Sequence, residues 1–236
     1  MLNLSEYRHK VELHAHTSPV SRCSEIPPAE LVQNYHALGC EAVAITNHFT
    51  PALLEYPSRE EALDFYMRDF AAAKAEGDRL GVRILLGFEL RFTESNNDYL
   101  LFGADESDAA AIYDHLGDGA EYFARNLKKP SQFFLQAHPF RSGMTLLDPA
   151  LLDGVESFNV HPGHNSRVAV AAKYAHEHHL IETCGTDYHH PGHQGLGLTL
   201  TRTLPGDTFE LAALLHSGDF LFEIGGDMVI PARLRA

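Results

Sequence analysis

The fold is indicated by residues 11–48, which read VELHAHTSPVSRCSEIPPAELVQNYHALGCEAVAITNH. Val11–His16 reads as a short strand, and Pro28–Leu38 reads as a helix with Pro near its first turn and Gly39 after its last residue. Ala42–Thr46 is an apolar run with the length of a buried strand. The stretch therefore predicts a strand, a helix and a second strand, which is the repeating unit of parallel α/β sheets.

The same alternation continues along the chain. The further helices that we expect are Glu60–Leu80, Ser107–Leu116, Glu121–Leu127, Ser166–His179 and Thr208–Ser217, and the further strands are Arg83–Glu89, Tyr99–Gly103, Phe133–His138, Gly154–Phe158, Ile181–Gly185, Gly197–Thr201 and Phe220–Ile224. Because apolar strands alternate with helices, we expect a parallel sheet covered by helices and closed, or nearly closed, into a barrel. The absence of a linker or internal repeat favours a single domain, residues 1–236.

Composition and charge limit the possible partners. The chain has 32 acidic and 18 basic residues, and the formal net charge of −14 opposes a sequence-independent grip on nucleic acid. No apolar stretch is long enough for a signal peptide or a membrane span. Cys23, Cys40 and Cys184 have no CxxC spacing, which suits a reducing compartment. We therefore expect a soluble, cytoplasmic protein with no membrane partner; its oligomeric state is not predicted.

Residues of the types that bind metal ions follow several of these strands. They occur in His14-Ala15-His16, Thr46-Asn47-His48, Gly87-Phe88-Glu89, Gln136-Ala137-His138-Pro139 and Gly185-Thr186-Asp187-Tyr188-His189. Side chains two apart on an extended segment project from the same face, so each pair can bind one ion. A buried carboxylate such as Glu89 is costly without a cation. Because functional groups of such barrels lie at the carboxyl ends of the strands, the clusters predict a multi-metal hydrolytic site.

Two of these clusters predict the local conformation of the backbone. His138 precedes Pro139, which predicts an extended conformation for His138 at the end of its strand. Gly185 precedes Asp187 and His189, and it allows the backbone to turn before these two residues.

These motifs resemble those of the PHP (polymerase and histidinol phosphatase) superfamily of metal-dependent phosphoesterases, from Glu12 to His189. The family motifs HxHT…S, TDH, GxE and GSDxH correspond to His14-Ala15-His16-Thr17 with Ser18, Ser21 and Ser24, to Thr46-Asn47-His48, to Gly87-Phe88-Glu89 and to Gly185-Thr186-Asp187-Tyr188-His189. The resemblance implies a distorted (β/α)7 TIM-like barrel. It also implies a first metal on His14, His16, Glu89 and Asp187, a second on Glu89 and His138, and a third position facing His48 and His189.

The chain departs from the family pattern at three places. Asn47 replaces the aspartate of TDH, and Arg22 stands where trinuclear members have a further histidine, with Cys23 beside it. The usual additional ligand of the second metal is not evident. We therefore expect two divalent cations, with a third only if Cys23 or water completes its site. Nitrogen and oxygen ligands admit zinc, manganese or iron.

Other polar residues near strand ends are candidates for substrate binding or proton transfer. Arg22, Arg141 and Arg167 could each clamp a phosphate oxygen, although each could equally be an exposed loop arginine. His48 or His189 could orient the phosphate or protonate the leaving oxygen. His161 could serve as a metal ligand or proton donor.

The sequence thus predicts a metal-dependent phosphoric ester hydrolase. Its expected partner is a small phosphorylated metabolite, such as histidinol phosphate, a nucleotide or a sugar phosphate, which metal-activated hydroxide would attack. Alternatives on the same site are a cyclic phosphodiesterase, an exonuclease, or a non-catalytic metal-binding regulatory protein. A further alternative is an enzyme that uses Cys23 as its nucleophile.

Overall fold

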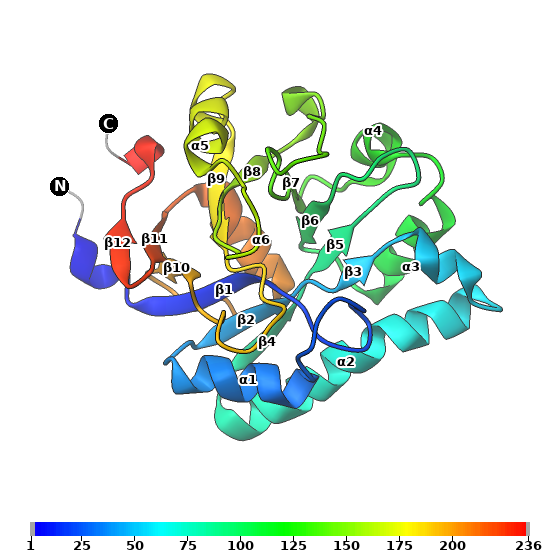
Figure 1. The fold of residues 1–236 in the computed structure, drawn as a ribbon, viewed down its shortest axis with the longest axis horizontal. Helices are drawn as coiled ribbons and strands as arrows, with labels where there is room; N and C mark the ends of the chain where they lie inside the picture. Colours follow the sequence, from blue (N-terminus) through cyan, green and yellow to red (C-terminus); the bar gives the residue numbers. More distant parts are fainter. Residues whose placement is uncertain (1–2, 235–236) are drawn as a thin grey trace.

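The computed structural model describes residues 3–234 as an α/β fold with two mixed sheets (Figure 1). The strands are β1 (His9–Ala15), β2 (Ala42–Ile45), β3 (His48–Phe49), β4 (Arg83–Leu86), β5 (Phe88–Leu90), β6 (Tyr99–Phe102), β7 (Phe133–Gln136), β8 (Gly154–Asn159), β9 (Ile181–Gly185), β10 (Gly197–Thr201), β11 (Phe220–Ile224) and β12 (Asp227–Val229). The helices are α1 (Pro28–Ala37), α2 (Arg59–Leu80), α3 (Glu106–Asp114), α4 (Ala120–Tyr122), α5 (Val168–Glu177) and α6 (Thr208–Ser217), and η2 (Pro51–Glu55) is a short 3₁₀-helix.

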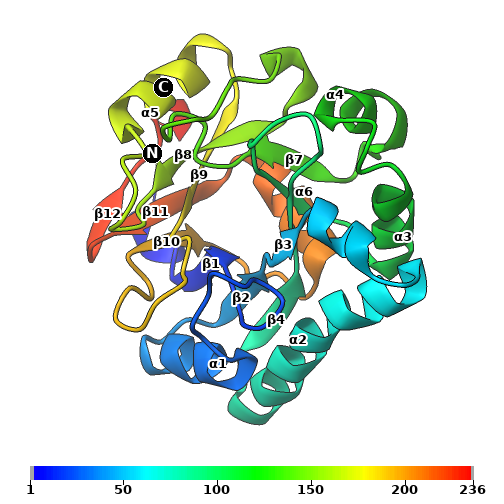
Figure 2. The same ribbon diagram turned by 45° about the vertical axis from the view of Figure 1, so that its right-hand side comes forward.

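The strands surround a common interior, and most of the helices lie outside them (Figure 2). The expected barrel is confirmed only in part, because hydrogen bonds divide the strands between two six-stranded sheets and close no barrel among residues 3–234. One sheet has the order β12-β11-β10-β1-β2-β4, and the other has the order β3-β5-β6-β7-β8-β9. A single bridge between Ala15 and Tyr188 joins them beside β1.

The expectation of a parallel sheet is wrong for half of the strand pairs. β1 pairs with β2, β2 with β4, β3 with β5, β7 with β8 and β8 with β9 in parallel, whereas β10, β11, β12 and β6 make antiparallel pairs. The reversal of β6 has a consequence for the site. Since β6 runs opposite to β5, the beginning of β6 lies at the edge where β5 ends.

Most of the predicted elements are present, with differences at their ends. The strand expected over Arg83–Glu89 is divided at Gly87 into β4 and β5. A Cβ atom on Gly87 would lie 2.8 Å from Thr46 Cγ2 and 3.0 Å from Phe102 Cε1, so the close approach of neighbouring strands requires glycine here. The helix expected over Glu121–Leu127 is instead one α-helical turn followed by a π-helical turn, Phe123–Leu127.

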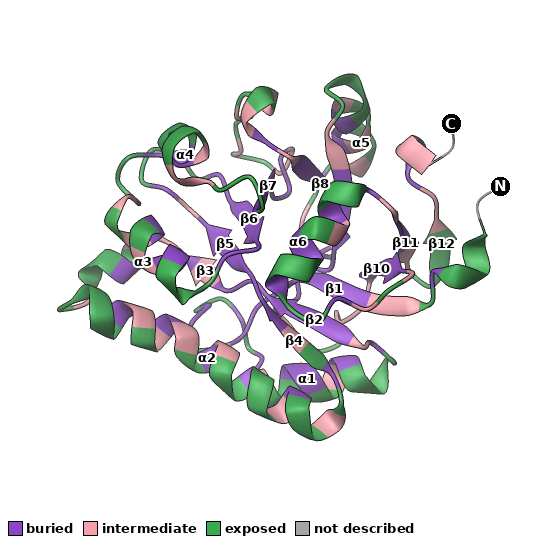
Figure 3. Cartoon of the chain, turned by 180° about the vertical axis from the view of Figure 1, so that it is seen from behind, coloured by how far each residue is buried: buried purple, intermediate pink, exposed green. Residues whose placement is uncertain are grey.

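Most buried residues of the fold are apolar. The outer faces of the helices are exposed (Figure 3). One cluster packs α6, through Leu211 and Leu215, against strand residues that include Leu100, Phe102 and Phe133. This packing covers the interior and holds the strands that carry the site. Between residues 3 and 234, no helix combines the length and apolarity needed to cross a membrane.

Candidate metal centre

The first group of candidate ligands lies where β1, β5 and β9 end. His14 Nε2 lies 3.2 Å from Glu89 Oε1 and 3.5 Å from Asp187 Oδ1. His16 Nε2 lies 3.5 Å from Glu89 Oε2 and 3.4 Å from Asp187 Oδ1. All four side chains are buried, and the two Nε2 atoms have no hydrogen-bond partner among the described residues. The structure therefore brings together the four residues that the sequence assigns to a first metal.

A divalent cation fits this group of atoms. Zinc and similar ions lie about 2.0–2.2 Å from nitrogen and oxygen ligands, so ligand atoms of one ion are about 3–4 Å apart. The nitrogen to carboxylate distances of 3.2–3.5 Å match that spacing. A cation would also satisfy the two buried nitrogens, which otherwise lack a partner.

Glu156 orients His14 from the side opposite the candidate metal. His14 Nδ1 lies 2.8 Å from Glu156 Oε1, and the backbone N–H of His138 donates to Glu156 Oε2 at 3.0 Å. A carboxylate on one ring nitrogen holds the proton there and leaves the other nitrogen free for a metal. A Cβ on Gly185 would lie 2.6 Å from both Glu156 Oε1 and His14 Cβ, so glycine is needed for this contact. The sequence analysis did not identify Glu156.

Two ligand candidates have unusual backbone conformations. Asp187 has φ of 55° and His138 has φ of 30°, both in the left-handed region. The extended conformation expected for His138 is therefore wrong. Hydrogen bonds outweigh the preference of a residue before proline, because His138 N donates to Glu156 and the His138 carbonyl accepts from Arg141 N at 3.0 Å. Such strain is concentrated at functional sites.

A second group consists of Glu89, Asp98 and His138. His138 Nε2 lies 3.2 Å from Glu89 Oε1 and 3.8 Å from Asp98 Oδ2. Asp98 is a candidate ligand that the sequence analysis did not identify. It precedes β6, and because β6 is antiparallel its first residues lie at the same edge as the carboxyl ends of the parallel strands. Arg91 donates to both oxygens of Asp98, at 2.7 and 2.8 Å.

A third group consists of His16, His48 and His189. Cys23 Sγ lies 3.7 Å from His48 Nδ1, and His48 Nε2 lies 2.8 Å from Glu89 Oε2. The sequence-adjacent Asn47 does not take part. Its side chain accepts from the Thr17 backbone N–H at 2.7 Å and from the Ser21 hydroxyl at 2.9 Å, which fixes the loop after β1.

The electrostatics of the site are those of carboxylates and imidazoles held close together. Burial raises the pKa of Glu89, but His14 and His48 lower it well below its usual value. Burial lowers the pKa of His48, yet Glu89 raises it to about 10, and Asp187 similarly raises that of the buried His189 to about 9. Burial raises the pKa of Cys23, while hydrogen bonds to His189 and His48 lower it to about 6.

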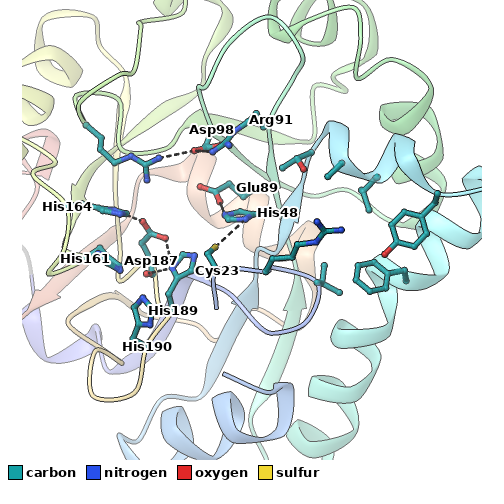
Figure 4. Close-up of a pocket in the computed structure, with 18 residues that line it drawn as sticks. Cys23, His48, Glu89, Arg91, Asp98, His161, His164, Asp187, His189 and His190 are labelled. Atoms are coloured by element: carbon teal, nitrogen blue, oxygen red, sulfur yellow. Dashed lines mark hydrogen bonds and ion pairs between the residues drawn. The ribbon is translucent and has the colours of Figure 1, made fainter. Parts of the chain in front are cut away.

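The other predicted residues differ in their relation to the site. Figure 4 shows His161 near Asp187 and His189 in the cavity lining. Arg22, Arg141 and His161 line a cavity of about 490 Å³ whose lining also includes several of the candidate ligands. Arg141 lies 3.6 Å from Asp98, whereas Arg22 has no hydrogen bond or ion pair among the described residues. His161 is buried, and its Nδ1 accepts from Gly163 N at 3.0 Å. Arg167 is not among the lining residues, and its guanidinium donates to the Phe140 carbonyl.

Three groups of metal-type ligands around Glu89, at the edge of mixed α/β sheets, define a candidate multi-metal centre. A family model for the PHP domain matches residues 12–223. The chain belongs to the PHP domain family, which confirms the resemblance seen in its motifs.

Solved structures with a similar fold are known. A two-domain protein from Bacteroides vulgatus containing a predicted PHP-like metal-dependent phosphoesterase matches with a TM-score of 0.64 and 17% identity, over 92% of this chain and 64% of that one. A putative metal-dependent phosphoesterase from Bifidobacterium adolescentis matches with a TM-score of 0.54 and 17% identity, over 89% of this chain and 96% of that one. PsfC from Pseudomonas syringae matches with a TM-score of 0.61 and 16% identity, over 88% of each chain. The chain thus spans less than two thirds of the first protein. No curated protein sequence matched.

Proposed function

We propose that the chain is a metal-dependent phosphomonoesterase that acts on a small phosphorylated metabolite. The observation that carries this proposal is the position of Glu89. One of its oxygens lies 3.2 Å from the Nε2 atoms of both His14 and His138, and the other lies 2.8 Å from His48 Nε2 and 3.5 Å from His16 Nε2. A carboxylate that faces ligands of neighbouring cations on both oxygens is suited to bridge them.

Different residues would bind the cations and the phosphate group during phosphate ester hydrolysis. Bound divalent cations supply Lewis acidity toward phosphoryl oxygens and a nucleophilic hydroxide at neutral pH. Asp187 and Glu89 would hold a cation at the first group, and Asp98 and His138 would hold one at the second, with Glu89 shared. The guanidinium groups of Arg91 and Arg141, which line the cavity, are placed to bind the non-bridging phosphate oxygens.

The third group admits two roles that depend on the number of cations. With two cations bound, His189 or His48 can donate a proton to the leaving oxygen, because both line the cavity. With three bound, the same histidines would be ligands, and Cys23, whose Sγ lies 3.7 Å from His48 Nδ1, would add a thiolate that favours zinc over manganese. Elemental analysis of the wild type beside Cys23→Ser separates these roles.

A small monoester is favoured over the alternatives by size and charge. A cavity of about 490 Å³ holds a metabolite rather than a polynucleotide. The formal charge of −14 also opposes binding of the long anionic chain that an exonuclease requires.

The test is turnover of a panel of substrates by the metal-loaded protein. We expect small phosphomonoesters to be hydrolysed and a cyclic nucleotide, an aryl phosphodiester and single-stranded DNA to be left intact. Asp187→Asn should reduce kcat/KM by about a thousandfold, because it removes a charged ligand. Asp78→Asn, at a side chain that is 71% exposed, is the control and should leave kcat/KM unchanged. Turnover confined to phosphodiesters would contradict the proposal.

A further inference from the structure

The tetrapeptide His-Pro-Gly-His occurs twice in the chain, after β8 and after β9. The two copies are His161-Pro162-Gly163-His164 and His190-Pro191-Gly192-His193. Each copy forms a turn. The backbone N–H of His164 donates to the His161 carbonyl at 3.1 Å, and that of His193 donates to the His190 carbonyl at 3.2 Å. Proline and glycine at the two central positions suit such turns. Each turn therefore has a histidine at both of its ends.

Histidine rings from the two turns gather in one place. The ring centroid of His161 lies 6.2 Å from that of His190 and 5.7 Å from that of His193, and the last two centroids are 5.8 Å apart. The angles between these three ring planes are 66–90°. Figure 4 shows His161 between His164 and His190. We call His161, His190 and His193 the outer histidines, and none of them belongs to the three ligand groups around Glu89.

The spacing of the outer histidines is close to that of a three-histidine metal site. Three imidazoles on one ion have ring centroids about 5–6 Å apart, because metal to nitrogen distances are about 2.0–2.1 Å and each centroid lies about 1 Å further out. The observed 5.7–6.2 Å is at the upper end of that range. An ion has to draw the rings slightly closer, and the His190 side chain, which is 41% exposed, has the freedom to rotate.

Two of the outer histidines already have surroundings that suit a metal ligand. His190 Nδ1 lies 3.4 Å from Glu25 Oε2, and a carboxylate at that nitrogen leaves Nε2 for an ion. His193 Nδ1 is buried without a hydrogen-bond partner among the described residues. His161 is 9% exposed, and its Nδ1 accepts from the Gly163 N–H. Binding an ion through His161 Nε2 costs this one hydrogen bond, which the exposed glycine can replace with water.

We propose that the outer histidines form a further transition-metal site, separate from the candidate centre around Glu89. Imidazole ligands suit zinc, copper and nickel, whereas calcium and magnesium prefer oxygen ligands. Water can complete the coordination, because Pro162 and Pro191 leave both turns exposed to solvent. The inference goes beyond the phosphomonoesterase proposal, since binding at this site does not depend on turnover.

Equilibrium dialysis against excess zinc, followed by elemental analysis of the protein, counts the bound ions. We expect the wild type to hold one equivalent more than His193→Ala, because this variant removes one of the three ligands and none of the ligands around Glu89. His36→Ala, which removes an exposed histidine on α1, is the control and should keep that equivalent. Equal zinc contents of the wild type and His193→Ala would overturn the site.

Two further variants distinguish the outer site from the centre and from a loss of folding. In Glu89→Gln the centre should lose metal, whereas the equivalent that depends on His193 should remain. Glu25→Gln, at a side chain that is 66% exposed, should leave the fold intact and weaken zinc binding at the outer site about tenfold. Loss of the additional equivalent in Glu89→Gln alone would assign that ion to the centre and overturn the outer site.

The choice of ion tests the ligand chemistry. Dialysis against calcium should give the same content in the wild type and in His193→Ala, because imidazole nitrogens bind calcium poorly. A calcium equivalent that His193→Ala removes would overturn the assignment of imidazole ligands.

Discussion

Arg91 and Asp98 form a two-point ion pair beside the second ligand group, with nitrogen to oxygen distances of 2.7 and 2.8 Å. Asp98 is 2% exposed, and its carboxylate also faces His138 at 3.8 Å. The arginine therefore compensates a buried carboxylate that a cation can share. The loss of this ion pair should therefore change the stability of the metal-free protein more than that of the metal-loaded protein.

Arg91→Met should destabilise the metal-free protein by about 2 kcal/mol, because the buried carboxylate loses its charged hydrogen bonds. A cation at the second group would compensate the same charge, so the loss should shrink when divalent metal is added. Thermal unfolding with and without metal measures both values. An equal loss in the two states would show that Asp98 does not contact the cation.

Glu156→Gln should weaken metal binding at His14 by about 10- to 100-fold, because the neutral amide holds the imidazole proton less strongly. Competition with a chromophoric chelator gives the affinity. Glu41→Gln is a matched control, since Glu41 lies 2.9 Å from His9 Nδ1 in a similar pair outside the cavity. Equal affinities of the Glu156 variant and the wild type would contradict the orienting role.

Metal binding at the third group should release protons. Glu89 raises the pKa of His48 to about 10, and Asp187 raises that of His189 to about 9, so both are protonated in the metal-free protein at pH 7. A cation binds only the deprotonated rings, so its apparent affinity should rise with pH up to about 10, the higher of the two pKa values, and fall as the solution is acidified. Calorimetry in two buffers of different ionisation enthalpy counts the protons. A count of zero at pH 7 would exclude a cation at these histidines.

Arg22→Ala should raise KM for a phosphomonoester by about tenfold, as expected for one charged hydrogen bond to substrate. Arg22 lines the cavity without an acidic partner among the described residues. Arg167→Ala is the comparison, because Arg167 lies outside the cavity lining and should leave KM unchanged. An unchanged KM for Arg22→Ala would remove this residue from substrate binding.

The sequence predicted those parts of the site that depend on local pattern. His14, His16, Glu89 and Asp187 could be found because each lies at or just after the end of a strand, and the carboxyl ends of parallel strands meet at one edge. The structure brings their nitrogen and carboxylate oxygen atoms to 3.2–3.5 Å of one another, which agrees with that reasoning.

The residues that sequence reasoning missed depend on long-range contacts. Asp98 stands at the start of a strand, which is the wrong end in a parallel sheet, and only the antiparallel pairing of β6 brings it to the ligands. Glu156 lies inside β8 and acts through His14, far away in the chain. The conformation of His138 was mispredicted for a similar reason, since a contact with Glu156 outweighs the local effect of proline.

Elemental analysis of the purified protein, together with phosphomonoester turnover before and after chelation, tests whether this cluster is a multi-metal hydrolytic centre. We expect at least two equivalents of zinc, manganese or iron, with turnover that is lost on chelation and restored by added metal. Glu89→Gln should lower the metal content, because it removes the carboxylate shared by the first two groups. A wild-type protein that binds no metal, or whose turnover survives full chelation but is lost on alkylation of Cys23, would contradict a multi-metal hydrolytic centre.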